Sequence, residues 1–474
     1  KPLFMNIKVW STALLILCLC PAAMAQKANR YLEKPLPQGW GKDASHAIPG
    51  DDNLFSGQIP PIDDKWWKAF DDPMLDSLIT VASTQNYSVL SAMARMDMAK
   101  SNLRIERGSF FPSISLDGGW ARQQSSGNVN ALPQSITGAY SASLNASWEL
   151  DVFGRMRNAK KQAKALYAQS EDYRQAVRTQ LITGIANTYY TLLMLDEQLD
   201  LSRQTETAWK ETVASTRALM NAGLANESAV SQMEAAYYQV QSSVLDLQQQ
   251  ISQVENSLAL LLAETPRNYE RGMLAKQQFP TDLSIGIPVR MLSSRPDVRS
   301  AERTLEAAFY GTNAARSAFY PSITLSGSAG WTNSAGSLIL NPGKFLASAV
   351  GSLTQPLFNK GQVVAQYRIA RAQQEEAALG FQQTLLNAGS EVNDALIAYQ
   401  TSQGKRILLD KQITSLQTAL RSTTLLMEHG NTTYLEVLTS RQSLLSAQLS
   451  QTVNHFTEIQ SLINLYRALG GGQE

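Results

Sequence analysis

Histidine and cysteine, the side chains that most often bind metals or act with a base as nucleophiles, are scarce in this sequence. The 474 residues include three histidines and two cysteines: His46, His429, His455, Cys18 and Cys20. A structural zinc site needs four such ligands and a cysteine nucleophile needs a base nearby, and this inventory supplies neither. We therefore expect no metal, no cofactor and no enzymatic activity.

The charge balance excludes a second class of function. The sequence has 41 Lys and Arg against 40 Asp and Glu, a net charge of +1 at pH 7. Binding to nucleic acid needs a clear cationic excess, so we expect no nucleic-acid partner. With 44% hydrophobic and 17% charged residues, the chain is also too apolar to be intrinsically disordered.

The first residues have the pattern of a secretory signal peptide. Lys8 precedes an uninterrupted apolar run over residues 13–20, and an Ala-Met-Ala cleavage motif ends at Ala25. We expect residues 1–25 to be removed, so that Gln26 is the mature N-terminus. The predicted protein is therefore exported.

Lipidation at a cysteine is the alternative mode of processing. A bacterial lipidation site has a small residue before its cysteine, whereas Leu17 and Leu19 precede Cys18 and Cys20. We therefore expect no acylation, with these two cysteines as weak candidates. No later stretch approaches 18 consecutive apolar residues, so we expect no transmembrane helix.

The sequence contains two copies of one unit. Three pairs of segments recur at offsets of 209, 205 and 207 residues: 110–116 with 319–325, 151–155 with 356–360, and 222–223 with 429–430. A nearly constant offset over such a distance indicates a duplication. It predicts an N-terminal extended segment (26–61), a first repeat (62–270), a linker (271–286), a second repeat (287–470) and a C-terminal tail (471–474).

Each repeat contains one very long helical stretch followed by a break and a second helix. The stretches 154–222 and 362–428 contain no proline, and at ~1.5 Å per residue each would be on the order of 100 Å long. From Met233 to Leu261, apolar residues alternate at intervals of four and three, which is a heptad seam for packing against another helix. A soluble coiled coil would explain this segment equally well.

Four segments have the alternation of β-strands. We expect strands at about 112–124, 138–151, 321–333 and 345–356, with Trp120, Trp148 and Trp331 as landmarks near strand ends. Over residues 140–150, apolar and polar side chains alternate without error, as in a strand of a membrane β-barrel. The fourth strand is weaker, because Leu346 and Val350 fall on its polar face.

Four strands cannot close a membrane barrel within one chain. Lipid tolerates no open sheet edge, and closed membrane barrels have at least about eight strands. Two chains would give a barrel of eight strands, and side chains fill the interior of such a barrel. Three chains would give twelve strands, which leave an open channel. The polar faces rich in Ser, Thr and Asn favour a watery channel, so we expect a homotrimer in outer-membrane lipid.

Several motifs carry a resemblance to a known family. In chain order they are WWKAFDDPML (66–75), FPSI (111–114), WELDVFG (148–154), SRPDVRSAE (294–302), YPSI (320–323), YLEVL (434–438) and LYRALGGG (465–472). Together they resemble the outer-membrane efflux protein (TolC) family, in the branch that serves resistance-nodulation-division (RND) pumps.

The resemblance implies a mixed α and β membrane protein with a defined place in an efflux system. Three chains would share a 12-stranded outer-membrane β-barrel, four strands from each, continued by a long periplasmic α-helical barrel. A periplasmic adaptor protein and an inner-membrane RND transporter would dock beneath it. The trimer would then be a passive exit duct in the outer membrane of a Gram-negative bacterium.

The resemblance also places functional residues near the two breaks. It implies that Gly223 and Gly430 lie in helix turns at the periplasmic end, where acidic residues constrict the channel and the adaptor binds. Glu227 and Glu436 follow these turns, and each would form a ring of three carboxylates in a trimer, which favours cations. The alternative is a glutamate that only stabilises a helix N-terminus.

Two further residues near the turns, Thr439 and His429, are not acidic. Thr439 occupies the position of a second acidic residue of the family. His429, beside the second turn, could make the turn sensitive to pH near neutrality, although a solvated histidine explains it as well.

Two other groups of residues have structural interpretations. We expect Trp66 and Trp67 to pack the N-terminal segment against the helices rather than to bind a ligand. The charged residues Arg295, Asp297, Arg299 and Glu302 stand at a helix start, and we interpret them as an ion-pair network.

Two alternative functions remain open on the sequence alone. A duct for type I protein secretion would share the fold and the strands. A periplasmic coiled-coil protein without a pore would share the helices but would dissolve without detergent.

Overall fold

The computed structural model describes residues 65–125, 135–223, 225–277, 294–333, 344–356, 358–429 and 433–471. All of these belong to one compact unit, which comprises residues 60–283 and 287–474. The predicted signal peptide (1–25), the segment 26–61 and most of the linker lie outside the described residues, as do both cysteines and the cleavage site.

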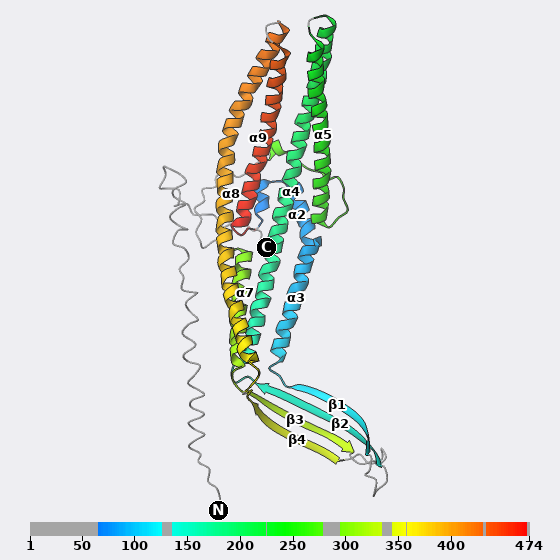
Figure 1. The fold of residues 1–474 in the computed structure, drawn as a ribbon, viewed down its shortest axis with the longest axis vertical. Helices are drawn as coiled ribbons and strands as arrows, with labels where there is room; N and C mark the ends of the chain where they lie inside the picture. The colour runs from blue at the N-terminus through cyan, green and yellow to red at the C-terminus, as the bar shows by residue number, and fades with distance from the viewer. Residues whose placement is uncertain are drawn as a thin grey trace, which may run out of the picture. The chain divides into compact units, whose positions relative to one another are not determined.

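Helices and strands follow the same order in both repeats (Figure 1). The first repeat comprises η3 (Trp66–Phe70), α2 (Pro73–Gln85), α3 (Tyr87–Gly108), β1 (Ser113–Ser125), β2 (Ser135–Leu150), α4 (Arg155–Asn221) and α5 (Glu227–Leu262). After η4 (Leu274–Lys276), the second comprises α7 (Pro296–Ser317), β3 (Ser322–Asn333), β4 (Lys344–Thr354), α8 (Gln362–Glu428) and α9 (Tyr434–Ala468). β4 ends two residues before Pro356, which has no N–H to donate to a sheet.

The long helices begin at equivalent glycines. Helices α4 and α8 each have 67 residues and are preceded by Gly154 and Gly361, whose φ angles are 80° and 77°. Glycine adopts this left-handed conformation without the steric cost of a Cβ atom. The predicted pairing of 151–155 with 356–360, at an offset of 205, is therefore wrong at the start of the helix. Gly154 is equivalent to Gly361, at an offset of 207, so the second repeat has two additional residues before its long helix.

The helices pack side by side in two successive sets of four (Figure 1). Beside the sheet, α4 contacts α3 and α7, and α7 contacts α8; farther from the sheet, α4 contacts α5 and α9, and α9 contacts α8. The predicted seam of α5 faces this packing, with Met233, Val244 and Leu258 buried. No helix among the described residues is long and apolar enough to cross a membrane.

Equivalent residues join the two sets of helices end to end. Asn86 caps α3, since its Oδ1 accepts from Ser88 and Val89 N–H, and its Nδ2 donates to the Leu261 carbonyl at the end of α5. In the second repeat, Arg295 precedes α7 and donates from Nη1 to the Ala468 carbonyl at the end of α9, at 3.1 Å. Both bonds satisfy carbonyls that a helix C-terminus leaves without a partner.

The four strands form one antiparallel sheet in the order β1-β2-β3-β4. Its register aligns like residues across the strands: Leu116, Leu144 and Ala329 are paired on one face, and Ser115 and Asn145 on the other. Leu346 and Val350 fall on the polar face, as the sequence indicated. Strands β1 and β4 are the two edges and have no partner within the described chain.

The geometry of the sheet predicts that alanine is tolerated very differently at two glycines of β3. A Cβ at Gly330 would lie 2.4 Å from the Ala142 carbonyl oxygen, whereas a Cβ at Gly327 would lie 3.7 Å from its nearest neighbour. We expect Gly330→Ala to separate β2 from β3 and to destabilise the sheet by about 1–3 kcal/mol, the usual cost of overpacking. Thermal melting followed by circular dichroism should show a lower midpoint for Gly330→Ala than for Gly327→Ala. Equal midpoints would contradict this register.

Candidate functional site: the sheet, the helical groove and the helix turns

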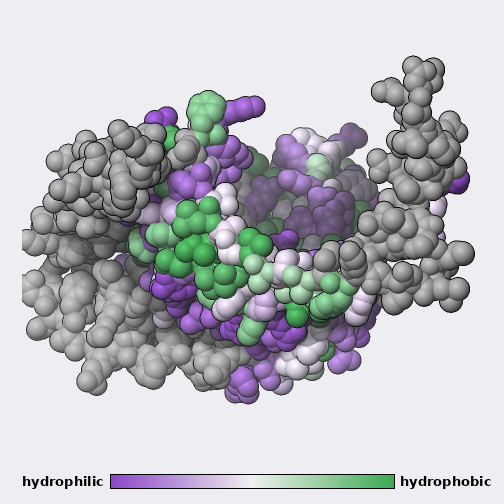
Figure 2. Space-filling view, turned by 90° about the horizontal axis from the view of Figure 1, so that it is seen from below, coloured by the Kyte–Doolittle hydropathy of each residue, from purple (hydrophilic) through white to green (hydrophobic). Residues whose placement is uncertain are grey.

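One face of the sheet is apolar and exposed. Leu116 is 78% exposed, Trp120 64% and Leu353 67%, although all three belong to regular strands. Figure 2 shows hydrophobic side chains gathered in a patch that hydrophilic side chains border. Water disfavours so large an apolar surface, so this face requires an apolar environment.

Aromatic residues mark both ends of the apolar face. Trp120 pairs with Tyr140, and the rings of Trp331 and Phe345 are 5.3 Å apart toward the same end. Trp148 lies eight residues along β2 from Tyr140. At ~3.3 Å per residue this separation is roughly 26 Å, comparable with the apolar band of about 25 Å between the aromatic girdles of membrane barrels.

The opposite face of the sheet is polar and hydrogen-bonded. Asn145 Nδ2 donates to Asp117, and the hydroxyls of Ser328 and Ser348 are 2.7 Å apart across β3 and β4. Such a face is suited to water.

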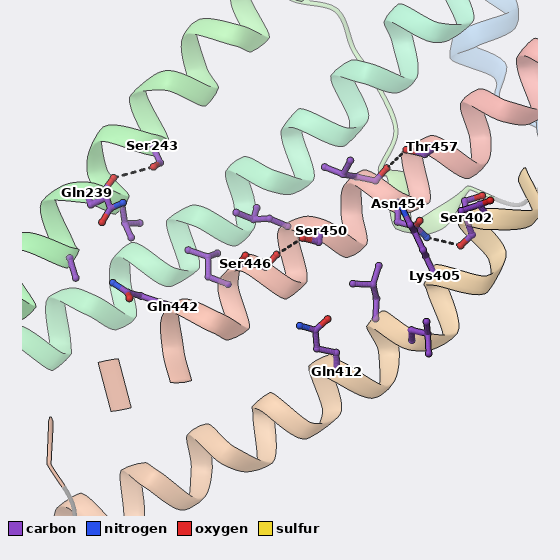
Figure 3. Close-up of a pocket in the computed structure, with 18 of the residues that line it drawn as sticks. Gln239, Ser243, Ser402, Lys405, Gln412, Gln442, Ser446, Ser450, Asn454 and Thr457 are labelled. Carbon is purple, nitrogen blue, oxygen red and sulfur yellow. Dashed lines mark hydrogen bonds between the residues drawn. The ribbon is translucent and has the colours of Figure 1, made fainter. Parts of the chain in front are cut away.

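A groove of about 1120 Å³, lined by both apolar and polar side chains, follows the helices on the far side of the joints from the sheet. Figure 3 shows the polar side chains that α5, α8 and α9 contribute to it. They are Gln239, Ser243, Ser402, Lys405, Gln412, Gln442, Ser446, Ser450, Asn454 and Thr457. Several hydroxyls are engaged with their own helix, such as Ser450 with the Ser446 carbonyl, and Asn454 donates to the Ser402 carbonyl. The groove therefore offers a mixed surface, in which these polar side chains alternate with apolar ones such as Leu445 and Leu449 and Lys405 is the one charged residue of the lining.

The groove and η3 lie on opposite faces of the helix layer. Trp66 of η3 stacks on Tyr466 of α9, with ring centroids 5.5 Å apart. At about 100° per residue, Ser446, Ser450 and Thr457 lie on the side of α9 opposite Tyr466. Polar residues at these positions of α9 could have indicated this face, although the groove itself also needs α5, α8 and Trp209 of α4.

The first helix turn is described up to Gly223 and again from residue 225. Gly223 has a φ of 77° and its N–H donates to the Met220 carbonyl, which ends α4. Asn226 caps α5 by accepting from Ala229 N–H at 2.8 Å. Glu227 follows in the first turn of α5 and is exposed.

The second turn places its predicted residues at the surface. Gly430 lies outside the described residues. His429 Nδ1 is 2.8 Å from the Leu425 carbonyl oxygen, so it already has a partner. Glu436 is exposed in the first turn of α9, and Thr439 donates to the Leu435 carbonyl. The structure thus places Glu227 and Glu436 at the N-termini of the helices after the turns.

An apolar cluster fixes the helices just below the turns. Trp209 of α4, Met233 of α5 and Leu438 of α9 pack together. The guanidinium of Arg441 lies 5.5 Å from the Trp209 ring centroid, and burial lowers the pKa of Arg441. No sequence pattern predicts this cation–π contact, because Trp209 and Arg441 are more than 200 residues apart.

The tryptophans near the N-terminus pack as predicted. Trp66 is 1% exposed, and Phe70 of the same 3-10 helix contacts Tyr190 and Tyr466. Trp67 donates from Nε1 to Asp76 of α2 at 2.8 Å. These side chains hold η3 against α4 and α9.

The charged residues at the start of α7 form ion pairs, as expected. Arg295 bonds both Asp297 and Glu391, at 2.6 and 2.8 Å, and Arg299 lies 3.0 Å from Asp172 of α4. Burial alone would raise the pKa of Asp297, but the hydrogen bonds and charge of Arg295 outweigh burial and lower it. No ion pair within the described chain involves Glu302.

Neither periodicity nor spacing indicates two further carboxyl groups, the buried Glu458 and the half-buried Glu197. Glu458 of α9 lies 3.5 Å from Arg406, and Glu197 of α4 accepts weakly from the Thr452 hydroxyl at 3.4 Å. In each, Oε2 is buried without a hydrogen-bond partner among the described residues. Burial raises the pKa of both carboxyls. Within the described residues, no group of three or more His, Cys, Asp or Glu could hold a metal ion.

Comparison with known proteins identifies the family. The model of the family described as "outer membrane efflux protein" matches residues 78–264 and 287–471, which are parts of both repeats. The chain belongs to the outer membrane efflux protein family. It is therefore an outer-membrane efflux channel, and the exposed apolar face of the sheet agrees with that location.

Relatives with known names are components of efflux pumps. The chain is 30% identical over 426 residues to the toluene efflux pump outer membrane protein TtgC of Pseudomonas putida, covering 88% of this chain and 87% of TtgC. It is 27% identical over 439 residues to the cation efflux system protein CusC of Escherichia coli, covering 92% and 94%.

Solved structures of outer-membrane channels share the fold. The channel OprN superposes with a TM-score of 0.83 at 25% identity, covering 90% of this chain and 97% of OprN. The open state of the Neisseria gonorrhoeae channel MtrE gives a TM-score of 0.78 at 27% identity, covering 88% and 94%. The match extends over both repeats, so the fold of the whole channel subunit is shared.

The half-buried Glu197 predicts a pH-dependent stability. Because its folded-state pKa is raised above the ordinary value near 4.5, its contribution favours the folded state at low pH and is lost as pH rises through the folded-state pKa. We expect Glu197→Gln to raise the melting temperature at pH 7.5, and the difference from wild type to shrink toward pH 4.5. Asp246→Asn, at an exposed site on α5, is the matched control and should change little. An unchanged or lower melting temperature of Glu197→Gln at pH 7.5 would contradict the assignment.

Proposed function

We propose that this channel is the exit duct of a tripartite RND-type efflux pump and that it works as a homotrimer. The observation that carries the proposal is the sheet, which has an apolar exposed face, a polar face and two open edges, β1 and β4. In lipid, an edge with unpaired backbone groups is too costly to persist. Pairing β1 of one chain with β4 of the next satisfies both edges, and three chains give a barrel of twelve strands.

Apolar stripes on the outer helices support the same assembly. Helices α3 and α5 border α4 on one side, and they expose Met98, Ile105 and Leu245. On the other side of the layer, α8 exposes Leu379 and Ile397. If α8 of one chain packs against α3 and α5 of the next, these apolar side chains become buried and the helical barrel closes beneath the strands.

The proposed path for substrate runs along the polar surfaces. The groove faces away from η3, and α2 packs beside η3 on α4, so we assign the groove face to the interior of the helical barrel. The polar face of the sheet continues this path through the membrane. Ser, Gln and Thr side chains offer weak, interchangeable hydrogen bonds, which suit passage of varied molecules without chemistry.

The partners follow from the relatives. TtgC and CusC are named as parts of a toluene pump and a cation efflux system, and we infer that this duct likewise receives substrate from an inner-membrane RND transporter through a periplasmic adaptor. The adaptor would bind at the helix turns near Gly223 and Gly430. These relatives favour efflux over type I protein secretion. They differ in substrate, so the substrate class of this duct stays open.

Native mass spectrometry and conductance together test the proposed function. Protein extracted with detergent from outer membranes should have the mass of three chains and should form discrete conducting steps in planar lipid bilayers. A monomer that dissolves without detergent, or a detergent-extracted protein that never conducts, would contradict the duct. The mass of each chain also tests whether Gln26 is the mature N-terminus and whether acyl chains are present.

We propose that Glu436, and secondarily Glu227, form acidic rings that constrict the closed duct. Both are exposed beside the turns, where the threefold axis would bring three copies together. We expect Glu436→Gln to raise the conductance of the closed state and to shift the reversal potential in a KCl gradient toward lower cation preference. Thr439→Asp, which adds a second ring of carboxylates, should shift the reversal potential toward higher cation preference.

The control for the gate is Asp246→Asn, which removes an exposed carboxylate on α5 away from the turn. If Glu436→Gln and Glu227→Gln both behave like this control, these glutamates act only at helix N-termini and do not gate the duct.

A further inference from the structure

The first turns of the two long helices carry an unusual excess of positive charge. Residues 155–164 and 360–371 contain eight Lys and Arg and no Asp or Glu, although the whole chain has 41 cations against 40 acids. Arg155 and Arg157 pair with Glu149 and Asp151 at the end of β2. The other six are exposed, and within the described chain none of them has a carboxylate partner: Lys160, Lys161, Lys164, Lys360, Arg368 and Arg371.

The same cationic positions recur in both repeats. At the offset of 207 residues, Lys161 and Lys164 of α4 correspond to Arg368 and Arg371 of α8. At the offset of 209, Arg107 near the end of α3 corresponds to Arg316 near the end of α7. All six are exposed. Each repeat therefore contributes cations at equivalent positions of the same helices.

Cations at this end of a helix are unfavourable for the helix itself. The N-terminus of a helix carries a partial positive charge, which favours Asp and Glu in the first turns and disfavours Lys and Arg. The first turns of α4 and α8 contain no acidic residue. At α4, Asp151 accepts from the Met156 and Arg157 N–H groups and offsets the charge of that helix end. The cations farther along both helices have no such partner, and their positive potential favours an anion from outside the chain.

A chain of contacts places these cations beside the apolar face of the sheet. Trp148 of that face donates from Nε1 to the Phe110 carbonyl at 3.0 Å, and Lys160 Nζ lies 5.3 Å from the centre of the Phe110 ring. The second repeat has an equivalent arrangement, in which Gln355 donates to the Phe319 carbonyl and Phe319 contacts Tyr367. The cations thus begin where the surface assigned to lipid ends.

The periodicity of α4 assigns Lys164 to the outer face of the helix layer. Steps of four and three residues lead from Lys164 through residues 168, 171, 175, 178, 182 and 185 to Tyr189. The hydroxyl of Tyr189 donates to Asp72 at the start of α2, at 2.7 Å. Lys164 therefore shares the face that α2 covers, which we have assigned to the outside of the duct.

We propose that Arg107, Lys161, Lys164, Arg316, Arg368 and Arg371 form a basic collar that binds the phosphate headgroups of anionic phospholipids. The inference rests on the proposed function, because it takes the apolar face of the sheet to be in the membrane. The collar lies directly below that face, within reach of the headgroups of the periplasmic leaflet. Lys and Arg beside an anionic surface bind it through charge, and this binding weakens as salt screens it.

The test compares lipids that differ in headgroup charge. Purified channel in non-ionic detergent is mixed with equal amounts of palmitoyl-oleoyl phosphatidylglycerol and phosphatidylcholine, and native mass spectrometry counts the bound lipids. The collar variant combines Lys161→Gln, Lys164→Gln, Arg368→Gln and Arg371→Gln. The matched control removes four exposed cations farther along the same helices: Arg203→Gln, Lys210→Gln, Lys411→Gln and Arg421→Gln.

We expect wild type and control to prefer phosphatidylglycerol, and the collar variant to lose that preference by about tenfold or more, since several cations are removed per chain. Equal binding of the two lipids by wild type, or a preference that the collar variant retains, would overturn the proposal. So would a collar variant that keeps the preference and changes only ion selectivity, because its cations would then face the channel.

The proposed function and the collar can fail separately. A trimer that conducts but shows no lipid preference leaves the duct intact and removes the collar. A chain that neither forms a trimer nor conducts removes the duct itself, and the collar with it.

Discussion

A strand in lipid cannot leave its backbone N–H and C=O groups unpaired, and this constraint determines much of the structure. The described chain supplies one sheet of four strands whose edges, β1 and β4, are both open. In the proposed trimer, neighbouring chains close these edges while the apolar face lies in lipid. The same symmetry would then fix which helix edges meet and would close the row of helices into the wall of a tunnel.

Duplication explains how one chain can supply equivalent parts of such a wall. The long helices α4 and α8 have equal length and start at equivalent glycines, and the joints at Asn86 and Arg295 occupy equivalent positions. The two joints use different chemistry for the same task, a neutral amide in one repeat and an ion-paired guanidinium in the other. The repeats are free to differ inside the chain, whereas their outer edges have to fit each other in the assembly.

Much of the fold could be predicted from sequence, because period and composition act locally. Alternation over 140–150 and the seam from Met233 to Leu261 gave the strand and the buried face of α5 that the structure has. The equivalence of Gly154 with Gly361 was missed, because a left-handed φ leaves no periodic signal. Contacts between distant segments, such as Arg441 on Trp209 or the burial of Glu197, depend on which helices become neighbours. The candidate gate residues could be placed beside the turns, but their position relative to the threefold axis belongs to the assembly.

Disulfide cross-linking between β1 and β4 tests the shared sheet most directly. Within one chain these strands are separated by β2 and β3, roughly 14 Å at about 4.8 Å per strand, which exceeds the limit of about 7 Å between Cα atoms for a disulfide. Ser115→Cys would be combined in turn with Ser348→Cys, Val350→Cys and Ser352→Cys, in a background with Cys18 and Cys20 replaced by alanine. If chains share one barrel, oxidised outer membranes should yield covalent dimers and trimers that a reductant returns to monomers. Monomers alone from every pair would contradict the shared barrel.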